Sequence, residues 1–408
     1  MTDNASAAPA AKVPAARFGG KGLNIGIAVA AVLTVAGLAL WGMQLSGGLV
    51  QTGMRNFDSW GLYITMFMFL VGLSAGGLII SSAPRVLGVE GFGGISKVAV
   101  WTSICCTVLA IGFVVVDLGQ PLRLWELFAY SNLGSPLMWD IAVLATYLVF
   151  SIVYLWAMLR YESGKGSAVS LRVISTIALV TAILVHSVTA WIFGLQQGRE
   201  MWHTALLAPW FVSSALVCGV ALVLVVVIAL RKAGYLELDQ KHVVKMLKLL
   251  GVFVCVDLYF FGCDLLTEGF PAGSGADIVA MLTTGALAPF FWIEVLGCAA
   301  TAVIAFTPKL RTNPLIVVAS LLAIAGIFCK RVQLLVGGFQ IPNLDMPAVV
   351  SGPALTDAGA ALQSAGGSMV YFPSMLEFGV VLGVFGLGAL MLLLGLKFLP
   401  LKPTERSH

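Results

Sequence analysis

The sequence predicts an all-α, polytopic membrane protein with ten transmembrane helices, and three observations lead to this fold class. Hydrophobic residues make up 59% of the 408 residues and charged residues only 10%, whereas about 25% of a soluble globular domain is charged. The mean hydropathy is +0.99. Ten apolar stretches of about 20 residues can each cross about 30 Å of hydrocarbon, because a helix rises about 1.5 Å per residue. A soluble globular protein is therefore excluded.

The apolar stretches set the order of the expected helices. Helices 1 to 5 are expected near residues 24–45, 59–82, 97–117, 139–159 and 173–194. Helices 6 to 10 are expected near residues 207–230, 246–265, 286–307, 314–336 and 374–396. The first stretch is too long for the core of a signal peptide and lacks a small-residue cleavage site, so we expect it to be a membrane helix.

Three segments are expected outside the helices. Residues 1–23, rich in Ala and Pro, are predicted to form a disordered cytoplasmic tail, and residues 397–408 a second cytoplasmic tail. Residues 337–373 form the longest loop and contain Pro342, Pro347 and Pro353. Because loops of this length are usually functional or disordered, we expect this one to contact an extracytoplasmic subunit.

The distribution of Lys and Arg predicts the orientation. Eighteen of these residues fall in the tails and loops on one side, and three, Arg55, Arg123 and Arg199, fall on the other. Because positive residues stay on the cytoplasmic side, we expect both termini in the cytoplasm of a multi-pass protein of the bacterial inner membrane. The net charge of +4 reflects this bias, so it does not indicate nucleic acid as a partner.

Several cofactor classes are not supported by the sequence. Only His186 lies well inside an expected helix, whereas a b-type haem needs paired axial histidines. The seven cysteines all fall in expected spans without C-x-x-C spacing and are interpreted as small core residues. We therefore expect no haem, no iron–sulfur cluster and no other metal in this chain. A phosphate-binding loop motif is also missing from the sequence, so ATP-driven transport is not indicated.

Polar residues gather at the outer ends of helices 2 to 5. His186 lies about two turns before the end of helix 5 and is expected to donate a hydrogen bond to a ligand carbonyl, with an acidic residue nearby to exchange protons. Asp58 and Glu200 are interpreted instead as helix caps or water-facing residues. The other members of this set are Trp60, Asp117, Arg123, Glu126, Asp140, Arg199, Trp202 and His203.

Several ordered blocks between residues 60 and 230 carry a resemblance. The blocks are Trp60-Gly61-Leu62-Tyr63, Gly72-Leu73-Ser74-Ala75-Gly76-Gly77, Asp117 to Trp125, Ser135 to Asp140, His186 to Trp191, Trp202-His203-Thr204 and Pro209-Trp210-Phe211-Val212. In these blocks the chain is similar to the NrfD/PsrC family of polysulfide reductase membrane subunits, of the ten-helix type found in alternative complex III. The ten-helix relatives often have His where this chain has Asp117.

The resemblance implies a quinone-reactive subunit that is not catalytic alone. Helices 2 to 5, within residues 57–200, would form a four-helix bundle that binds menaquinone or ubiquinone. It would exchange electrons with a periplasmic ferredoxin-like iron–sulfur subunit, which in turn serves a molybdopterin-type catalytic subunit. The catalytic residues implied are His186, Asp117 and Asp140, and the quinone-binding set adds Trp60, Tyr63, Arg123, Trp139 and His203.

A second four-helix bundle is expected from helices 6 to 9, within residues 205–336. Charged residues within its helices have two interpretations: a structural group of ion pairs, or a path for proton translocation. Asp257 and Glu294 are the best candidates for proton transfer. The full set is Asp257, Asp264, Glu294, Lys330 and Arg331. Glu377, near the start of helix 10, is interpreted as a cap or a partner contact.

Two rival functions stay open. Duplicated bundles and charges inside the membrane also fit a secondary transporter of a small solute or ion, although the charges of the first bundle lie toward one face rather than at mid-membrane. The chain could also be an anchor without a site of its own.

Overall fold

The computed structural model describes residues 20–55, 58–86, 88, 91–270, 274–340 and 371–402. Within these residues ten helices are long and apolar enough to cross a membrane, so the predicted all-helical polytopic fold is confirmed. They are α1 (Lys21–Gly47), α2 (Leu62–Val86), α3 (Ser96–Asp117), α5 (Pro136–Glu162), α6 (Ala168–Gly194), α7 (Leu207–Lys232), α8 (Gln240–Gly269), α10 (Ala288–Phe306), α11 (Asn313–Gln340) and α13 (Met375–Phe398). Most of the predicted tail 1–23 and of the predicted loop 337–373, and half of the predicted tail 397–408, lie outside the described residues.

The helix ends correct several predicted boundaries. The predicted tail 1–23 is too long because α1 begins at Lys21, and the predicted loop begins too early because α11 continues to Gln340. α8 is longer at both ends than its apolar stretch, because polar residues continue the helix beyond the part that hydrocarbon would cover. Two short helices, α4 (Glu126–Ala129) and α9 (Ser274–Thr283), were not predicted.

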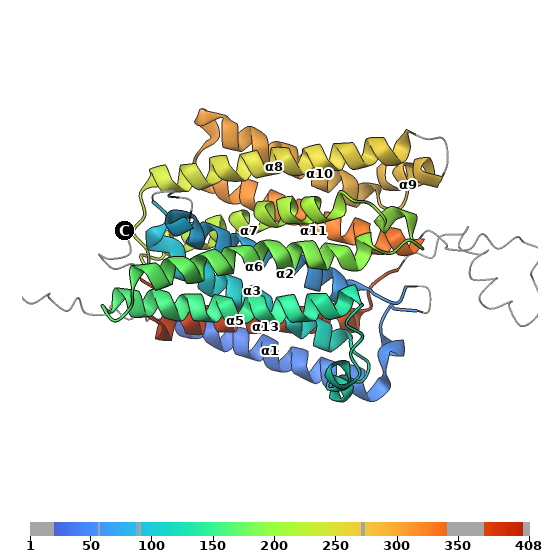
Figure 1. Ribbon diagram of the computed structural model, residues 1–408, viewed down its shortest axis with the longest axis horizontal. Coiled ribbons are helices and arrows are strands. Elements are labelled where there is room, and N and C mark those ends of the chain that lie inside the picture. Colours follow the sequence, from blue (N-terminus) through green and yellow to red (C-terminus); the bar gives the residue numbers. More distant parts are fainter. Residues whose placement is uncertain are drawn as a thin grey trace, which may run out of the picture.

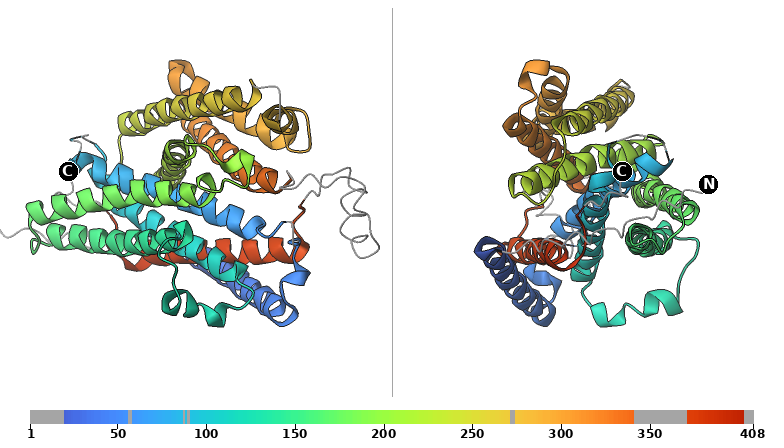
Figure 2. Two further views of the ribbon diagram at one scale, coloured as in Figure 1. Left: turned by 45° about the vertical axis from the view of Figure 1, so that its right-hand side comes forward. Right: turned by 90° about the vertical axis from the view of Figure 1, so that its left-hand side faces the viewer.

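The long helices lie side by side and pack into two groups (Figure 1). In the first group, α2 packs on α3 and α6, and α5 packs on α3 and α6. In the second group, α7 and α10 each pack on both α8 and α11. α1 and α13 pack on each other, and α13 also contacts α3. Figure 2 shows α1 at one edge of the molecule and α8 and α10 at the opposite edge.

α2 lies at the centre and joins the two groups through contacts with α7 and α11. Of its most apolar window 89% is buried, compared with 17% for α1. Gly76 of α2 approaches Gly219 of α7 so closely that a Cβ on either glycine would collide with the backbone of the other. Small residues allow membrane helices to approach closely, and this glycine pair does so where the two groups meet.

The two ends of the helices carry different contacts. Asn24 near the start of α1 accepts a hydrogen bond from Lys397 near the end of α13, over 3.0 Å, and we call this side the terminal end. Here the buried ammonium of Lys97 lies 2.6 Å from Glu162. The opposite side, where α1 and α3 end and α2 begins, is called the distal end; there Gln44 links Val116 and Tyr63.

Candidate functional site

The buried polar side chains of the first helix group are found from about one helical turn below the distal end inward. Asp140 of α5 is 3% exposed and accepts a hydrogen bond of 2.5 Å from the hydroxyl of Thr189 on α6. His186 lies one turn deeper than Thr189 on the same helix. Since residues three apart share a helix face, Thr189 joins Asp140 to the face of α6 that carries His186.

His186 is enclosed without a hydrogen-bond partner. Its side chain is 2% exposed, and neither ring nitrogen makes a hydrogen bond to any described residue. The ring lies against the backbone of Val71 and Gly72 on α2 and of Ala182 on its own helix, and it is within electrostatic range of Arg331 on α11. Because buried polar groups are normally hydrogen-bonded, these two nitrogens are equipped to receive a polar ligand.

Asp117 is surrounded by different residues from those around His186 and Asp140. As the last residue of α3, it lies within electrostatic range of Tyr63 and Glu377, and its Oδ1 makes no hydrogen bond to the described part of the chain. The hydroxyl of Tyr63 donates to Gln44 of α1 over 2.6 Å. Asp117 and Tyr63 therefore face α1 and α13, and no hydrogen bond among the described residues joins them to the pair of Asp140 and His186.

Aromatic rings close the distal end above His186. Trp60 packs edge-on against Phe193 of α6 and Phe339 of α11, with centroid distances of 5.9 and 6.4 Å. Trp202 contacts the same two rings at 5.1 and 5.2 Å. Phe193 lies seven residues, or about two turns, beyond His186 on α6. Trp60 therefore forms part of a cover rather than a direct contact of the imidazole.

The remaining members of the predicted quinone-binding set lie nearer the surface. Arg123 is exposed and pairs with Glu126 over 2.7 Å, and this hydrogen bond raises the pKa of its guanidinium. Trp139 is 38% exposed, and its indole N–H donates to the carbonyl of Leu133. Nδ1 of His203 lies 3.1 Å from the carbonyl oxygen of Gly194, where α6 ends.

For two acidic residues at the distal end, Asp58 and Glu377, the structure tests the interpretation made from the sequence. Asp58 is only 4% exposed, so its interpretation as a water-facing residue is wrong. Burial raises the pKa of the Asp58 carboxyl, while Arg199 lowers it in part. Glu377 is confirmed as a cap, because it forms a capping box with Ser374 at the start of α13.

Two carboxylates of the second group form ion pairs with Lys330. Its ammonium lies 2.5 Å from Asp257 of α8 and 3.1 Å from Glu294 of α10. Gln333 donates to Glu294 over 2.7 Å, and Ser213 donates to Asp257 over 3.0 Å. All three charged side chains are at most 4% exposed. The structural ion pairs expected here are present, and we call Lys330, Asp257 and Glu294 the lysine cluster.

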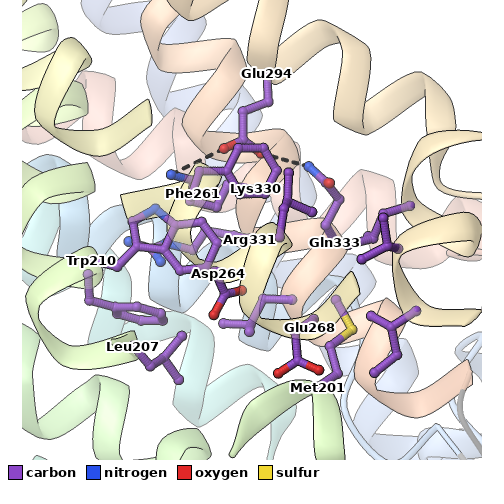
Figure 3. A pocket seen from close by; sticks show the side chains of 16 residues that line it. Met201, Leu207, Trp210, Phe261, Asp264, Glu268, Glu294, Lys330, Arg331 and Gln333 are labelled. Carbon is purple, nitrogen blue, oxygen red and sulfur yellow. Dashed lines mark hydrogen bonds and ion pairs between the residues drawn. The ribbon is translucent and has the colours of Figure 1, made fainter. Parts of the chain in front are cut away.

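A partly open pocket leads to the lysine cluster (Figure 3). It is lined by residues of α7, α8, α9, α10 and α11. Asp264 and Glu268 line it on the side of Met201, away from Glu294. The pocket thus places two further carboxylates between the distal loop that carries Met201 and the buried ions.

Sequence reasoning missed several polar partners. Thr189 could have been found from its spacing to His186, which predicts a shared helix face. Ser213 and Ser214 of α7 were not among the predicted site residues, yet they form hydrogen bonds with Asp257 and Arg331. Gln333 lies three residues after Lys330, so the same spacing rule would have placed it near the cluster.

Ten apolar helices around buried, ion-paired and unpartnered polar groups define a polytopic membrane protein with polar sites in its interior. The chain belongs to the family described as polysulphide reductase, NrfD, whose model matches residues 50–343.

Three relatives cover nearly the whole chain. A putative membrane subunit of a dimethyl sulfoxide reductase of Halobacterium salinarum is 33% identical, over 92% of this chain and 91% of the relative. The integral membrane subunit of an Hdr-like menaquinol oxidoreductase of Archaeoglobus fulgidus is 26% identical, over 93% of both chains. The integral membrane subunit of a menaquinone reductase of Nitratidesulfovibrio vulgaris is 24% identical, over 90% of both chains.

Proposed function

We propose that this chain is the quinone-reactive membrane subunit of a multi-subunit oxidoreductase, and that it passes electrons between the membrane quinone pool and an iron–sulfur subunit. Two relatives that match along almost their whole length are named for menaquinol or menaquinone. The observation that carries the proposal is His186, an imidazole buried inside the first helix group with both nitrogens unpartnered by the described residues.

The residues around His186 fit a quinone head group. A bound quinone would supply a carrier of two electrons and two protons. His186 would donate a hydrogen bond to one carbonyl oxygen, and Asp140, held by Thr189, would exchange a proton. Asp117 and Tyr63, near the distal ends of α3 and α2, would exchange protons with the outside rather than contact the same oxygen.

We assign the distal end to the periplasm and both termini to the cytoplasm of the inner membrane. The support is the excess of Lys and Arg in the segments on the terminal side. The partners would bind at the distal end: a ferredoxin-like iron–sulfur subunit first, with a molybdopterin-type catalytic subunit attached to it.

Purification from native membranes tests the function directly. The complex should contain iron–sulfur and molybdenum subunits, and organic extraction should release about one quinone per copy of this chain. A membrane protein of similar size from the same preparation, purified under the same detergent conditions, controls for quinone carried over with lipid. An isolated chain that binds a solute and no quinone would instead support the secondary transporter.

We further propose that the second helix group translocates protons. The pocket lined by Asp264 and Glu268 leads from the distal loop toward the lysine cluster, and carboxylates spaced along facing helices are suitable relay groups. Glu294 lines this pocket, whereas Asp257 lies behind it on Lys330.

Proton release and uptake by vesicles that contain the complex test this path. Glu294→Gln and Asp257→Asn should lower the ratio of protons moved to electrons transferred, while quinol turnover stays within about threefold of the native rate. Glu237→Gln, which removes an exposed carboxylate of the loop before α8 outside the pocket, is the matched control. An unchanged ratio in both cluster variants would remove translocation from the proposal.

A further inference from the structure

The connection between α3 and α5 exposes a face of large apolar side chains. We call residues 118–135, which include α4, the aromatic loop. Leu122, Trp125 and Phe128 follow one another at a spacing of three, which places them on one face of consecutive helical turns. Leu124 and Leu127, between them, are partly buried. The loop has five large side chains that are between 59% and 90% exposed: Leu122, Trp125, Phe128, Tyr130 and Leu133. Exposed apolar side chains gathered in this way mark contact with a membrane or with another protein.

The aromatic loop carries no net charge. Its two charged residues are Arg123 and Glu126, and the guanidinium donates two hydrogen bonds, of 2.8 and 2.7 Å, to the carboxylate. Because the two charges neutralise each other, they can lie at the edge of hydrocarbon at a lower cost than either charge alone. The loop therefore has the composition of an uncharged amphipathic segment.

The aromatic loop lies beside the long helices rather than past their ends. In Figure 1, where the long helices run along the horizontal, α4 is the short teal helix at the lower edge, and it reaches no further toward the distal end than α1 does. Figure 2 shows α4 standing off from the packed helices in both views. A Cβ at Gly119 would lie 3.3 Å from Leu49, which follows the end of α1 closely. The loop thus begins at the depth where α1 ends, which is the expected depth of the boundary between lipid and water.

The exposed apolar surface continues from the loop onto helices that face lipid. Only 17% of the most apolar window of α1 is buried, and Met43 near its distal end is exposed. α5 begins directly after the loop, and Leu137 and Trp139 in its first turn are exposed as well. A membrane helix with apolar residues on its outer side has lipid there. The same lipid is therefore available to the aromatic loop.

We propose that the aromatic loop binds phospholipid, with its exposed face inserted into the boundary between headgroups and acyl chains at the distal end. Trp and Tyr are enriched at this boundary because their rings are apolar and their N–H and O–H groups are polar. Amphipathic segments lie in the plane of the boundary with the apolar face about 5–10 Å deep. Since the loop has no net charge, zwitterionic lipid suffices as the ligand. This surface is separate from the site around His186 and is independent of the proposed function.

Photo-crosslinking from the loop identifies what covers it. The complex with Phe128→p-benzoylphenylalanine is reconstituted into phosphatidylcholine vesicles and illuminated, and the labelled peptide is analysed by mass spectrometry. The main product should be an adduct with intact phospholipid, in a yield within about twofold of that from the same probe at Val149, an exposed residue midway along α5. The probe at Lys165, exposed in the loop between α5 and α6, is the water-facing control and should give about tenfold less lipid adduct.

Two results at position 128 would overturn the proposal: an adduct with another subunit as the main product, or a lipid yield no higher than that from Lys165. Tyr130→p-benzoylphenylalanine provides a second exposed position in the same loop, so the test does not depend on the assembly of a single variant. Adding phosphatidylglycerol should change the lipid yield by less than about twofold. A requirement for this anionic lipid would contradict insertion by apolar side chains. Because these measurements need no quinone, they can fail while the quinone-reactive function stands.

Discussion

Replacing His186 with Ala should abolish quinol-linked turnover while the complex still assembles. The side chain has no hydrogen bond to any described residue, so its removal breaks no protein contact of that kind and leaves a small cavity between α6 and α2. Loss of a positioned donor or proton-transfer group typically lowers a rate by about 10²- to 10⁴-fold. The measurement is quinol oxidation by the purified complex, with the presence of every subunit verified by gel filtration.

Two variants make the His186 result specific. His242→Ala removes the histidine at the start of α8 and should leave turnover unchanged. Thr189→Val keeps the shape of the side chain but deprives Asp140 of its hydrogen bond, and it should lower turnover by about tenfold, less than the loss of the imidazole. Normal turnover in His186→Ala would refute the assigned role, and a complex that fails to assemble would show that His186 is structural.

The order of the membrane helices could be predicted because each is marked by its own apolar run. Their true ends could not, because a helix continues into polar residues once it leaves hydrocarbon; α8 does so at both ends. α4, with four residues, and α9, with ten, are too short to stand out by hydropathy. Ion pairs were one of the two interpretations of the charges in the second group, since charges within apolar helices need partners.

The separation of Asp117 from His186 could not be predicted. A sequence gives the depth of a residue along a membrane helix, but the direction in which it faces depends on an apolar stripe opposite a polar one. α3 and α6 are apolar on most sides, so their rotation about the helix axis cannot be read from the amino-acid pattern. The structure turns Asp117 toward Tyr63 and Glu377, whereas His186 faces α2 and Arg331.

The largest effect on stability is expected for Lys330→Met. This change removes the ammonium that contacts both Asp257 and Glu294 and leaves two carboxylates buried without a counter-ion on Lys330. Breaking a buried ion pair from one side typically costs about 3–5 kcal/mol. Equilibrium unfolding of the detergent-purified protein should show a loss of this size, while Lys309→Met, at an exposed lysine in the loop after α10, should change stability by less than about 0.5 kcal/mol.

The triple variant Lys330→Met, Asp257→Asn, Glu294→Gln separates charge from packing. If uncompensated charge causes the loss, neutralising both acids should restore most of the stability, because replacement of a whole buried ion group by neutral residues is often close to neutral. Ser213 and Gln333 would still offer hydrogen bonds to the two amides. A triple variant as unstable as Lys330→Met would show instead that the lysine side chain acts through its packing against Trp210 and Phe261.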